Sequence, residues 1–439
     1  MVRDSAGLGS DSPDTGALRI TGTSAHGVDW APRVYEDDIL LGLPSLGQVR
    51  PLIGAMALSG SLSPDDASLR SGVLLGEGDA DRFGAAFATL PQPDGSVDLW
   101  VGAPDMQGPG TAVGAGAVYR FVDWATRADE TLDAATEAST RVLSELAADR
   151  LGEVIEACGD HDGDGLPELL VSAPWDSSGA ALGGRVHLID GDEPDTLARE
   201  VLSGQLRHSW TSSAPGARLG QAMSCSADLD GDGLADLALG APYQDVAGRD
   251  AAGSVFLLLS GVEHPDGDVS AVSDLTLSGS TANSWFGAAI ATGDLSGDGL
   301  AELAVGAPGR DGTRGWVSVF EGSALQSGSA RPRTRLEGPE GRARLGASLL
   351  IADADGDGLA DLLAGAPREG ELSFEAGAVY RFAGTVGLEG WPSLGGVEDA
   401  SERLASEALL SHLGAQLASG DPDGDGRAAL LWTLATQPE

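Results

Sequence analysis

The chain has 439 residues, of which 67 are Asp or Glu and 26 are basic, so its net charge is −41 at pH 7. This excess of negative charge argues against nucleic acid as a partner, because phosphate binding requires clustered positive charge. All the basic residues are arginines, which excludes a P-loop, a Schiff-base lysine and a lysine general base.

The first 17 residues are polar and precede the first strand-like segment, so we expect them to be disordered or to form an edge strand. They contain no apolar stretch typical of an export signal, and no run of 18 apolar residues occurs anywhere in the chain. The sequence therefore predicts no transmembrane segment.

A turn motif then recurs along the chain, in which an aromatic residue or a leucine is followed by glycine. These glycines are residues 84, 152, 220, 287, 346 and 414, so the steps between them are 68, 68, 67, 59 and 68 residues. A seventh copy, which lacks the acidic loop, is expected at Gly27. A constant period marks a repeat architecture, and these steps are too long for the common helical solenoids or for forty-residue propeller blades.

Each repeat contains four short segments typical of β-strands. In the repeat that begins at Gly220 they are residues 221–227, 237–240, 253–259 and 275–279. No segment of helical length has a convincing 3.6-residue periodicity. Four-stranded units repeated radially form a propeller. The sequence therefore predicts an all-β fold over residues 18–439, a single seven-bladed β-propeller of four-stranded blades that start near residues 27, 84, 152, 220, 287, 346 and 414.

The last blade is incomplete, because the sequence ends soon after a predicted second strand at residues 430–434. Residues 18–22 match the fourth strand of the other repeats, so we expect them to supply its outer strand. Strands from both termini would then close the propeller and leave no free sheet edge. The third strand comes either from residues 1–9 or from chain beyond the given sequence.

A nine-residue acidic loop joins the predicted first and second strands of blades three to seven. Carboxylates at loop positions 1, 3, 5 and 9 are hard oxygen ligands, and glycines at positions 4 and 6 allow tight wrapping. The loops predict four calcium (Ca²⁺) sites, with a fifth candidate in the last loop, where Ala429 stands at position 9. The alternative is a solvated Asp-Gly turn. The candidate metal ligands are Asp160, Asp162, Asp164, Leu166 and Glu168; Asp228, Asp230, Asp232, Leu234 and Asp236; Asp294, Ser296, Asp298, Leu300 and Glu302; Asp353, Asp355, Asp357, Leu359 and Asp361; and Asp421, Asp423, Asp425 and Arg427.

Two sequence motifs resemble those of a known family. Arg82-Phe-Gly84 and Trp285-Phe-Gly287, together with Gly-Ala-Pro at 102–104, 240–242, 306–308 and 365–367, are similar to FG-GAP repeats. Such repeats build the seven-bladed propeller at the N-terminus of integrin alpha chains and of many bacterial surface proteins. The resemblance implies that the calcium loops join the first and second strands of the later blades. It also implies a ligand-binding face on the opposite side of the propeller.

The connections from strand two to strand three, and from strand four to the next blade, would lie on this ligand face. Exposed aromatic rings beside carboxylates and arginines are suited to a sugar or a protein side chain. The alternative is that each tryptophan packs against the neighbouring blade. The candidate residues are Trp175, Asp176, Tyr243, Asp245, Arg310 and Asp311 from the first kind of connection, and His208, Trp210, Arg342 and Arg344 from the second.

No motif supports catalysis, since the six histidines form no ligand spacing and no nucleophile elbow or zinc-protease pair occurs. We therefore expect a monomeric, non-catalytic adhesion or protein-interaction module. A calcium-dependent lectin and a polysaccharide-degrading enzyme remain as alternatives. Calcium loops make sense where calcium is abundant, so an extracellular or cell-surface location is expected, although no export signal is present.

The two cysteines, Cys158 and Cys225, precede the acidic loops of adjacent blades and are offset by one residue when the loops are aligned. Alternation along a strand would send such side chains to opposite faces. Two buried thiols are therefore the first expectation, with a disulfide as the alternative.

Overall fold

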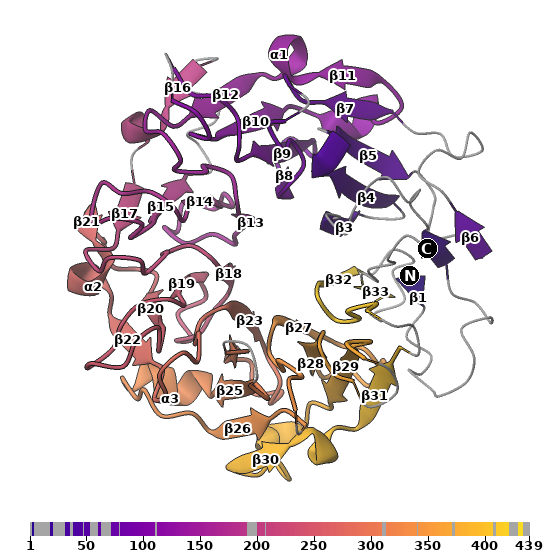
Figure 1. Cartoon of the computed structure of the whole chain (residues 1–439), viewed down its shortest axis with the longest axis vertical. Coiled ribbons are helices and arrows are strands. Elements are labelled where there is room, and N and C mark those ends of the chain that lie inside the picture. Colours follow the sequence, from indigo (N-terminus) through magenta and orange to yellow (C-terminus); the bar gives the residue numbers. More distant parts are fainter. Residues whose placement is uncertain are drawn as a thin grey trace.

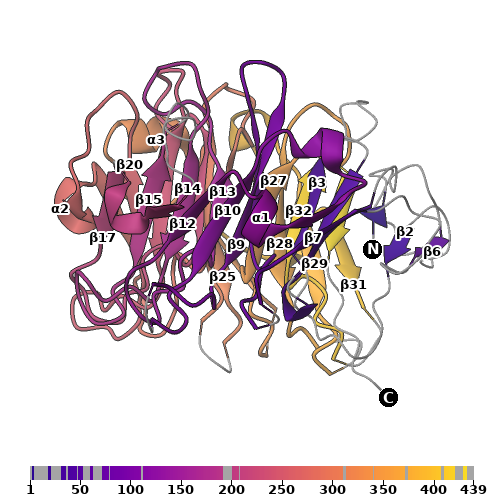
Figure 2. The same ribbon diagram turned by 90° about the horizontal axis from the view of Figure 1, so that it is seen from above.

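The structure is a computed structural model of the chain. It describes residues 2–3, 18–20, 31–35, 38–46, 48–52, 60–62, 72–78, 80–109, 112–190, 200–206, 208–309, 313–339, 341–370, 374–406, 410–420 and 429–432. In this part of the chain the strands form seven sheets, which lie as sectors of a ring with one strand of each sheet nearest the centre (Figure 1). Figure 2 shows the ring from its side, with the sheets running from one face to the other. The predicted all-β propeller fold is confirmed.

The sheets are numbered 1 to 7 here in the chain order of their innermost strands, and each is given from the centre outward. Sheet 1 consists of β3 (Ala31–Tyr35), β4 (Asp38–Leu43), β5 (Gln48–Leu52), β7 (Val73–Leu75) and β11 (Thr131–Asp133). Sheet 2 consists of β8 (Phe87–Pro91), β9 (Val97–Ala103), β10 (Ala117–Phe121), β12 (Thr140–Leu143) and β16 (Glu200–Leu202). Sheet 3 consists of β13 (Ile155–Ala157), β14 (Leu169–Ala173), β15 (Arg185–Ile189), β17 (His208–Thr211) and β21 (Gly267–Asp268).

The remaining sheets repeat this plan. Sheet 4 consists of β18 (Met223–Ala227), β19 (Asp236–Ala241), β20 (Ser254–Leu258) and β22 (Leu275–Ser278). Sheet 5 consists of β23 (Ala289–Gly293), β24 (Glu302–Ala307), β25 (Trp316–Phe320), β26 (Thr334–Glu337) and β30 (Leu394–Gly396). Sheet 6 consists of β27 (Ser348–Ala352), β28 (Asp361–Ala366), β29 (Ala378–Phe382) and β31 (Glu402–Ala405). Sheet 7 consists of β32 (Leu417–Gly420), β33 (Ala429–Trp432), β1 (Val2–Arg3), β2 (Leu18–Ile20) and β6 (Gly60–Leu62).

The helices among the described residues are short and lie in the connections. Their bounds are α1 (Ala134–Glu137), α2 (Val269–Val272) and α3 (Gly322–Gln326), with 3-10 turns η1 (Pro44–Leu46), η3 (Trp124–Arg127), η5 (Ser203–Gln205), η6 (Val386–Leu388) and η7 (Val397–Asp399).

The core of the ring lies between the sheets. Strands such as β19 and β24 are buried along their whole length, because both of their faces are covered by neighbouring sheets. One cluster joins Leu188 and Trp210 of sheet 3 to Leu239 and Phe256 of sheet 4. Burial on both faces explains why the second and third strands read as continuous apolar runs in the sequence.

Contact between glycines explains the recurring turn and Gly-Ala-Pro motifs. Gly152 has a φ of 86°, a conformation that glycine adopts without steric penalty. A Cβ atom added to Gly102, the glycine of the preceding sheet's Gly-Ala-Pro, would lie only 2.2 Å from the carbonyl oxygen of Gly152. The same contact joins Gly306 to Gly346 and Gly365 to Gly414. The two motifs therefore mark where adjacent sheets touch through their backbones.

Among the described residues, five of the seven sheets carry a fifth strand, which the four-stranded prediction missed. In each case the connection between the third and fourth strands of one sheet runs alongside the fourth strand of the preceding sheet. β11 pairs with β7 in parallel, β16 with β12, β21 with β17, β30 with β26 and β6 with β2. This added strand covers an outer edge that would otherwise be open, and it links successive sheets.

Sheet 7 joins the two ends of the described chain. β1 pairs with β33, with Val2 opposite Leu431 and Arg3 opposite Leu430. β2 pairs with β1 on its other side. The N-terminal segment thus supplies the third strand, which is one of the two predicted alternatives, and Leu18–Ile20 supplies the fourth.

The expectation of two thiols is wrong, because Cys158 and Cys225 form a disulfide with their Cα atoms 4.7 Å apart. The residues belong to neighbouring sheets, and in a propeller one face of each sheet packs against the opposite face of the next. The one-residue offset that sends the side chains to opposite faces therefore brings them together across the interface between sheets 3 and 4.

Candidate metal centres

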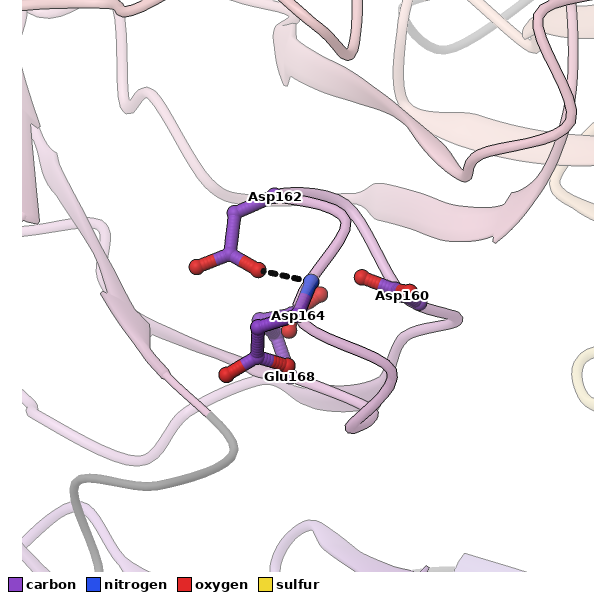
Figure 3. A group of neighbouring side chains, drawn as sticks. All are labelled: Asp160, Asp162, Asp164 and Glu168. Atoms are coloured by element: carbon purple, nitrogen blue, oxygen red, sulfur yellow. Dashed lines mark hydrogen bonds between the residues drawn. The ribbon is translucent and has the colours of Figure 1, made fainter.

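The acidic loop of sheet 3 connects β13 to β14 and gathers four carboxylates at one point. Asp160, Asp162, Asp164 and Glu168 each have an oxygen within 4.8 Å of the others (Figure 3). This is the arrangement that positions 1, 3, 5 and 9 of the loop predict. Hard carboxylate oxygens converging on one point are the donors that Ca²⁺ takes.

Backbone hydrogen bonds hold this loop in shape. The two oxygens of Asp160 accept from the amides of Gly163 at 2.7 Å and Gly165 at 2.9 Å. The amide of Asp164 donates to Asp162 at 3.0 Å, and that of Leu166 donates to Asp164 at 2.8 Å. The side chains therefore both shape the loop and form its acidic cluster.

Glu168 provides the observation that points most directly to a cation. Its side chain is fully buried, and its Oε2 accepts from the His161 amide at 2.6 Å. Its Oε1 is buried without a hydrogen-bond partner. Burial, with a smaller effect from the nearby Asp162, Asp160 and Asp164 charges, raises the pKa of Glu168 to about 8. A buried oxygen of this kind is costly unless something positive binds it, so a divalent cation fits the donor set.

The loop of sheet 4, between β18 and β19, repeats this geometry with one difference. Asp228, Asp230 and Asp236 approach one another within 4.8 Å. Asp232, at position 5, instead accepts from the hydroxyl of Ser260 at 2.9 Å. Three of the four predicted carboxylates of this loop are therefore brought together.

The loop of sheet 5, between β23 and β24, has a serine at position 3. Ser296 is buried, and its hydroxyl donates to Asp294 at 3.4 Å. Glu302 accepts from the amides of Leu295 and Ser296, at 2.9 and 3.0 Å. Burial and the charge of Asp298 raise the pKa of Glu302 to about 7. This loop keeps the fold of the others with fewer carboxylates.

The loop of sheet 6, between β27 and β28, brings Asp353, Asp355 and Asp357 within 4.8 Å of one another. Asp361 at position 9 binds an arginine instead, as described below. The fifth loop, with Asp421, Asp423, Asp425 and Arg427, lies outside the described residues.

The leucines at position 7 stabilise each loop through hydrogen bonds from their backbone amides. Each amide donates to the aspartate at position 5, at 2.8 to 2.9 Å. Their side chains face the preceding loop: Leu234 lies near Gly163, Leu300 near Gly231 and Leu359 near Gly297. Successive loops are therefore packed against one another along one face of the ring.

Comparison with known proteins gives three matches to the FG-GAP repeat model, at residues 224–258, 286–320 and 345–380. Each match runs from the first strand of a sheet, or the turn before it, into the third strand, and so spans an acidic loop. This chain contains FG-GAP repeats.

Curated proteins with similar sequences fall into two groups. Phosphatidylinositol-glycan-specific phospholipase D of Rattus norvegicus is 39% identical over 166 residues, which is 36% of this chain and 20% of that protein. Integrin alpha-X of Mus musculus is 32% identical over 224 residues, covering 48% of this chain and 18% of that protein. Integrin alpha-7 of Homo sapiens is 37% identical over 165 residues, covering 37% of this chain and 13% of that protein. The chain thus spans about a fifth or less of the length of these relatives.

A solved structure of the Dos1 propeller aligns with 90% of this chain and 74% of that chain, with a TM-score of 0.45 and 9% identity. Among the described residues, no helix is both long and apolar enough to span a membrane.

On the face opposite the acidic loops, arginines and aromatic rings form a continuous row. The guanidinium carbons of Arg150 and Arg218 each lie 4.4 Å from the ring centre of Trp175. Arg218 also lies 4.9 Å from the ring of Tyr243, which packs edge-on against Trp285 at 5.4 Å. These contacts connect sheets 3, 4 and 5 on the predicted ligand face.

The sequence analysis placed Trp175, Tyr243 and Arg344 on this face but did not single out Arg150, Arg218 or Trp285. The signal in the sequence is their shared place two positions before a turn glycine, where each described residue has a positive φ. These residues are Arg82, Arg150, Arg218, Trp285, Arg344 and His412.

Two of the other predicted ligand-face residues are buried. Trp210 lies within β17 and is 1% exposed, and Asp176 is 2% exposed. His208, also in β17, lies 3.5 Å from Asp190. Asp176 lies in the predicted connection but is buried there, while the side chain of His208 is 37% exposed. For Trp210 the expectation of a ligand-face position is wrong, because packing between sheets takes its side chain into the core. Asp245 accepts from the Ala251 amide at 2.8 Å, while Arg310 and Asp311 lie outside the described residues.

Proposed function

We propose that this protein is a calcium-binding, seven-bladed FG-GAP propeller that acts outside the cell as a non-catalytic adhesion or protein-interaction module. The seven sheets are its blades, and the acidic loops between the first and second strands of the later blades are the metal sites. The buried, unpartnered Oε1 of Glu168 beside three aspartates carries the calcium proposal. Similarity to integrin alpha chains supports the interaction role.

In this proposal the loops supply hard oxygen donors and the ion supplies the positive charge that the folded loop lacks. The structural consequence is a rigid rim on one face of the ring. The opposite face, with its row of arginines and aromatic rings, is left for a partner. Its guanidinium groups are suited to carboxylates of an acidic protein surface.

The test is a calorimetric Ca²⁺ titration of chelator-stripped protein, with the melting temperature followed in parallel. Each filled site stabilises the folded protein by about 2.7 kcal/mol when free calcium is a hundredfold above the dissociation constant. Several bound ions with a rise in melting temperature are expected. No bound ion and no shift would leave the loops as solvated acidic turns.

A calcium-dependent lectin is the second candidate, because aromatic rings lie on the predicted ligand face. Two guanidinium groups already lie over the ring of Trp175, which leaves little of it for a sugar to stack on. Glycan-array binding measured with calcium and with chelator separates the two: calcium-dependent binding of a defined glycan would favour the lectin. One group of relatives is named as a phosphatidylinositol-glycan-specific phospholipase D, so an assay for hydrolysis of phosphatidylinositol-glycan tests the non-catalytic proposal, and hydrolysis would contradict it.

A further inference from the structure

Two sheets share one third-strand sequence. Residues 117–121 of β10 and 378–382 of β29 both read Ala-Val-Tyr-Arg-Phe. Arg120 lies opposite Trp100 in the register of sheet 2, two residues beyond Asp98. Arg381 lies opposite Leu363 in sheet 6, two residues beyond Asp361. The two arginines therefore occupy the same place, next to the carboxylate that enters the second strand.

In sheet 2, this arginine neutralises a carboxylate whose acidic loop is missing. Asp98 is fully buried, and its Oδ2 receives Arg120 Nε at 2.6 Å and Nη2 at 2.5 Å. Its Oδ1 accepts from the Asp123 amide at 3.1 Å. The loop before it, residues 91–97, contains a single carboxylate, Asp94. The ion pair with Arg120 provides the positive charge that the buried Asp98 requires.

In sheet 6, the arginine is present together with a full acidic loop. Arg381 Nη1 lies 2.6 Å from Asp355 and 3.1 Å from Asp361, the residues at loop positions 3 and 9. Its Nε lies 3.1 Å from Glu402. The side chain of Arg381 is only 9% exposed. A guanidinium group is therefore built into the carboxylate cluster.

Sheets 3, 4 and 5 carry an apolar residue at this position. Register places Leu188, Leu257 and Val319 where the arginines stand, each opposite a residue two positions beyond the carboxylate at loop position 9. These three side chains are buried and bring no charge to their loops. The unpartnered oxygen of Glu168 is found in one of these sheets.

We propose that Arg120 and Arg381 are built-in cations that take the place of a metal ion. In sheet 2, Arg120 has replaced the ion completely. In sheet 6, Arg381 competes with it, so the loop 353–361 keeps its shape without calcium and binds calcium more weakly than the loops at 160–168 and 228–236. This inference rests on the proposed calcium binding, since competition requires an ion to compete with.

The physical reason is that an ion in the sheet 6 loop would need oxygens that Arg381 already holds. Asp355 is an expected ligand at position 3, and Asp361 at position 9. To bind there, the ion must displace a buried guanidinium or share two carboxylates with it. An adjacent like charge and the loss of charge-assisted hydrogen bonds both weaken cation binding.

The first experiment follows hydrogen exchange of the unaltered full chain during a Ca²⁺ titration. The amides of Gly163 and Gly165, and those of Gly231 and Gly233, are expected to gain protection at low calcium. Those of Gly356 and Gly358 are expected to be protected already in chelator and to change only at higher calcium. Equal responses of all loops at the same calcium concentration would overturn the inference. No response in any loop would instead overturn the proposed calcium binding, so the two failures are distinct.

The second experiment is the substitution Arg381→Leu, which installs the residue found at 188 and 257. Removing the competing charge is expected to tighten calcium binding at this loop by about tenfold and to make its protection depend on calcium. Arg314→Leu is the matched control, because Arg314 pairs with Glu337 at an exposed position away from the acidic loops. If the calcium affinity of this loop were the same in Arg381→Leu as in the control, Arg381 would not compete with calcium there. If Arg381→Leu fails to fold, the exchange experiment on the unaltered chain still decides the matter.

Discussion

Sheets 2 and 3 differ in how they neutralise a buried carboxylate. In each, a fully buried carboxylate stands where the second strand begins, Asp98 in one and Glu168 in the other. Asp98 binds Arg120 from its own sheet, whereas Glu168 has one oxygen without a partner and three aspartates nearby. The same propeller scaffold therefore accepts a cation that belongs to the chain or one that comes from solution. Only the second kind makes the fold depend on its surroundings.

The strongest test of this contrast is removal of calcium. With three arginine-free loops emptied, the apparent free energy of unfolding is expected to fall by about 8 kcal/mol, from about 2.7 kcal/mol per site at a hundredfold excess of calcium. Thermal and urea unfolding, monitored with calcium and with chelator, measure this loss. Amide hydrogen exchange should show a loss of protection in sheets 3 to 5 and little change in sheet 2. A uniform loss across all sheets would contradict the contrast.

The second largest effect is expected from Arg120→Leu. Leaving Asp98 buried without its partner costs about 3–5 kcal/mol, as for other broken buried ion pairs. Calcium should not reduce this cost, because the loop 91–97 lacks the carboxylates to bind it. Urea unfolding measures it.

Arg381→Leu is the matched comparison for that substitution. In chelator it should also destabilise the protein, but calcium should restore most of the loss. Equal losses for both variants in saturating calcium would break the proposed distinction between the two sheets.

The third prediction concerns the disulfide, which ties sheet 3 to sheet 4 beside two acidic loops. Replacing Cys158 and Cys225 together by serine is expected to lower stability by about 2–4 kcal/mol. Thermal unfolding of the double variant against the oxidised protein measures this. Two reactive thiols found by labelling the native, non-reduced protein would contradict the pairing.

The last prediction concerns pH dependence. In the metal-free folded protein, Glu168 has a pKa of about 8, against an ordinary value of 4.5. The folded state holds this proton more tightly than the unfolded state, so stability present below pH 4.5 is lost as the pH rises to 8. Glu168→Gln carries no such proton and should show a flatter decline in melting temperature over this range. Parallel curves for the two proteins would contradict the role of burial at this site.

The features that the sequence predicted correctly are those set by backbone geometry. The turn glycines revealed the repeat, because adjacent sheets touch through them. The Asp-x-Asp-Gly-Asp-Gly pattern predicted the acidic loops, because Asp160 accepts hydrogen bonds from the amides of Gly163 and Gly165. It also placed Leu18–Ile20 in the closing sheet. All of these are signals carried by residues near one another in the chain.

What the sequence did not predict depends on contacts between sheets. The pairing of Cys158 with Cys225 follows from which faces of neighbouring sheets meet, and strand alternation alone gave the opposite answer. Arg381 was missed for another reason: its partner Asp355 is 26 residues away, in the connection between β27 and β28 of the same sheet. The row from Arg150 to Trp285 also spans several sheets.

The parallel fifth strands set an order of events during synthesis. β7 ends at Leu75, but the strand that covers it, β11, begins only at Thr131. Sheets 1, 2, 3 and 5 therefore leave the ribosome with an open outer edge and must wait for the following sheet to complete it. The ring itself stays open longest, because β1 emerges first and its neighbour β33 last. Newly made chains thus pass through a long interval of exposed strand edges, in which neighbouring nascent chains can exchange strands.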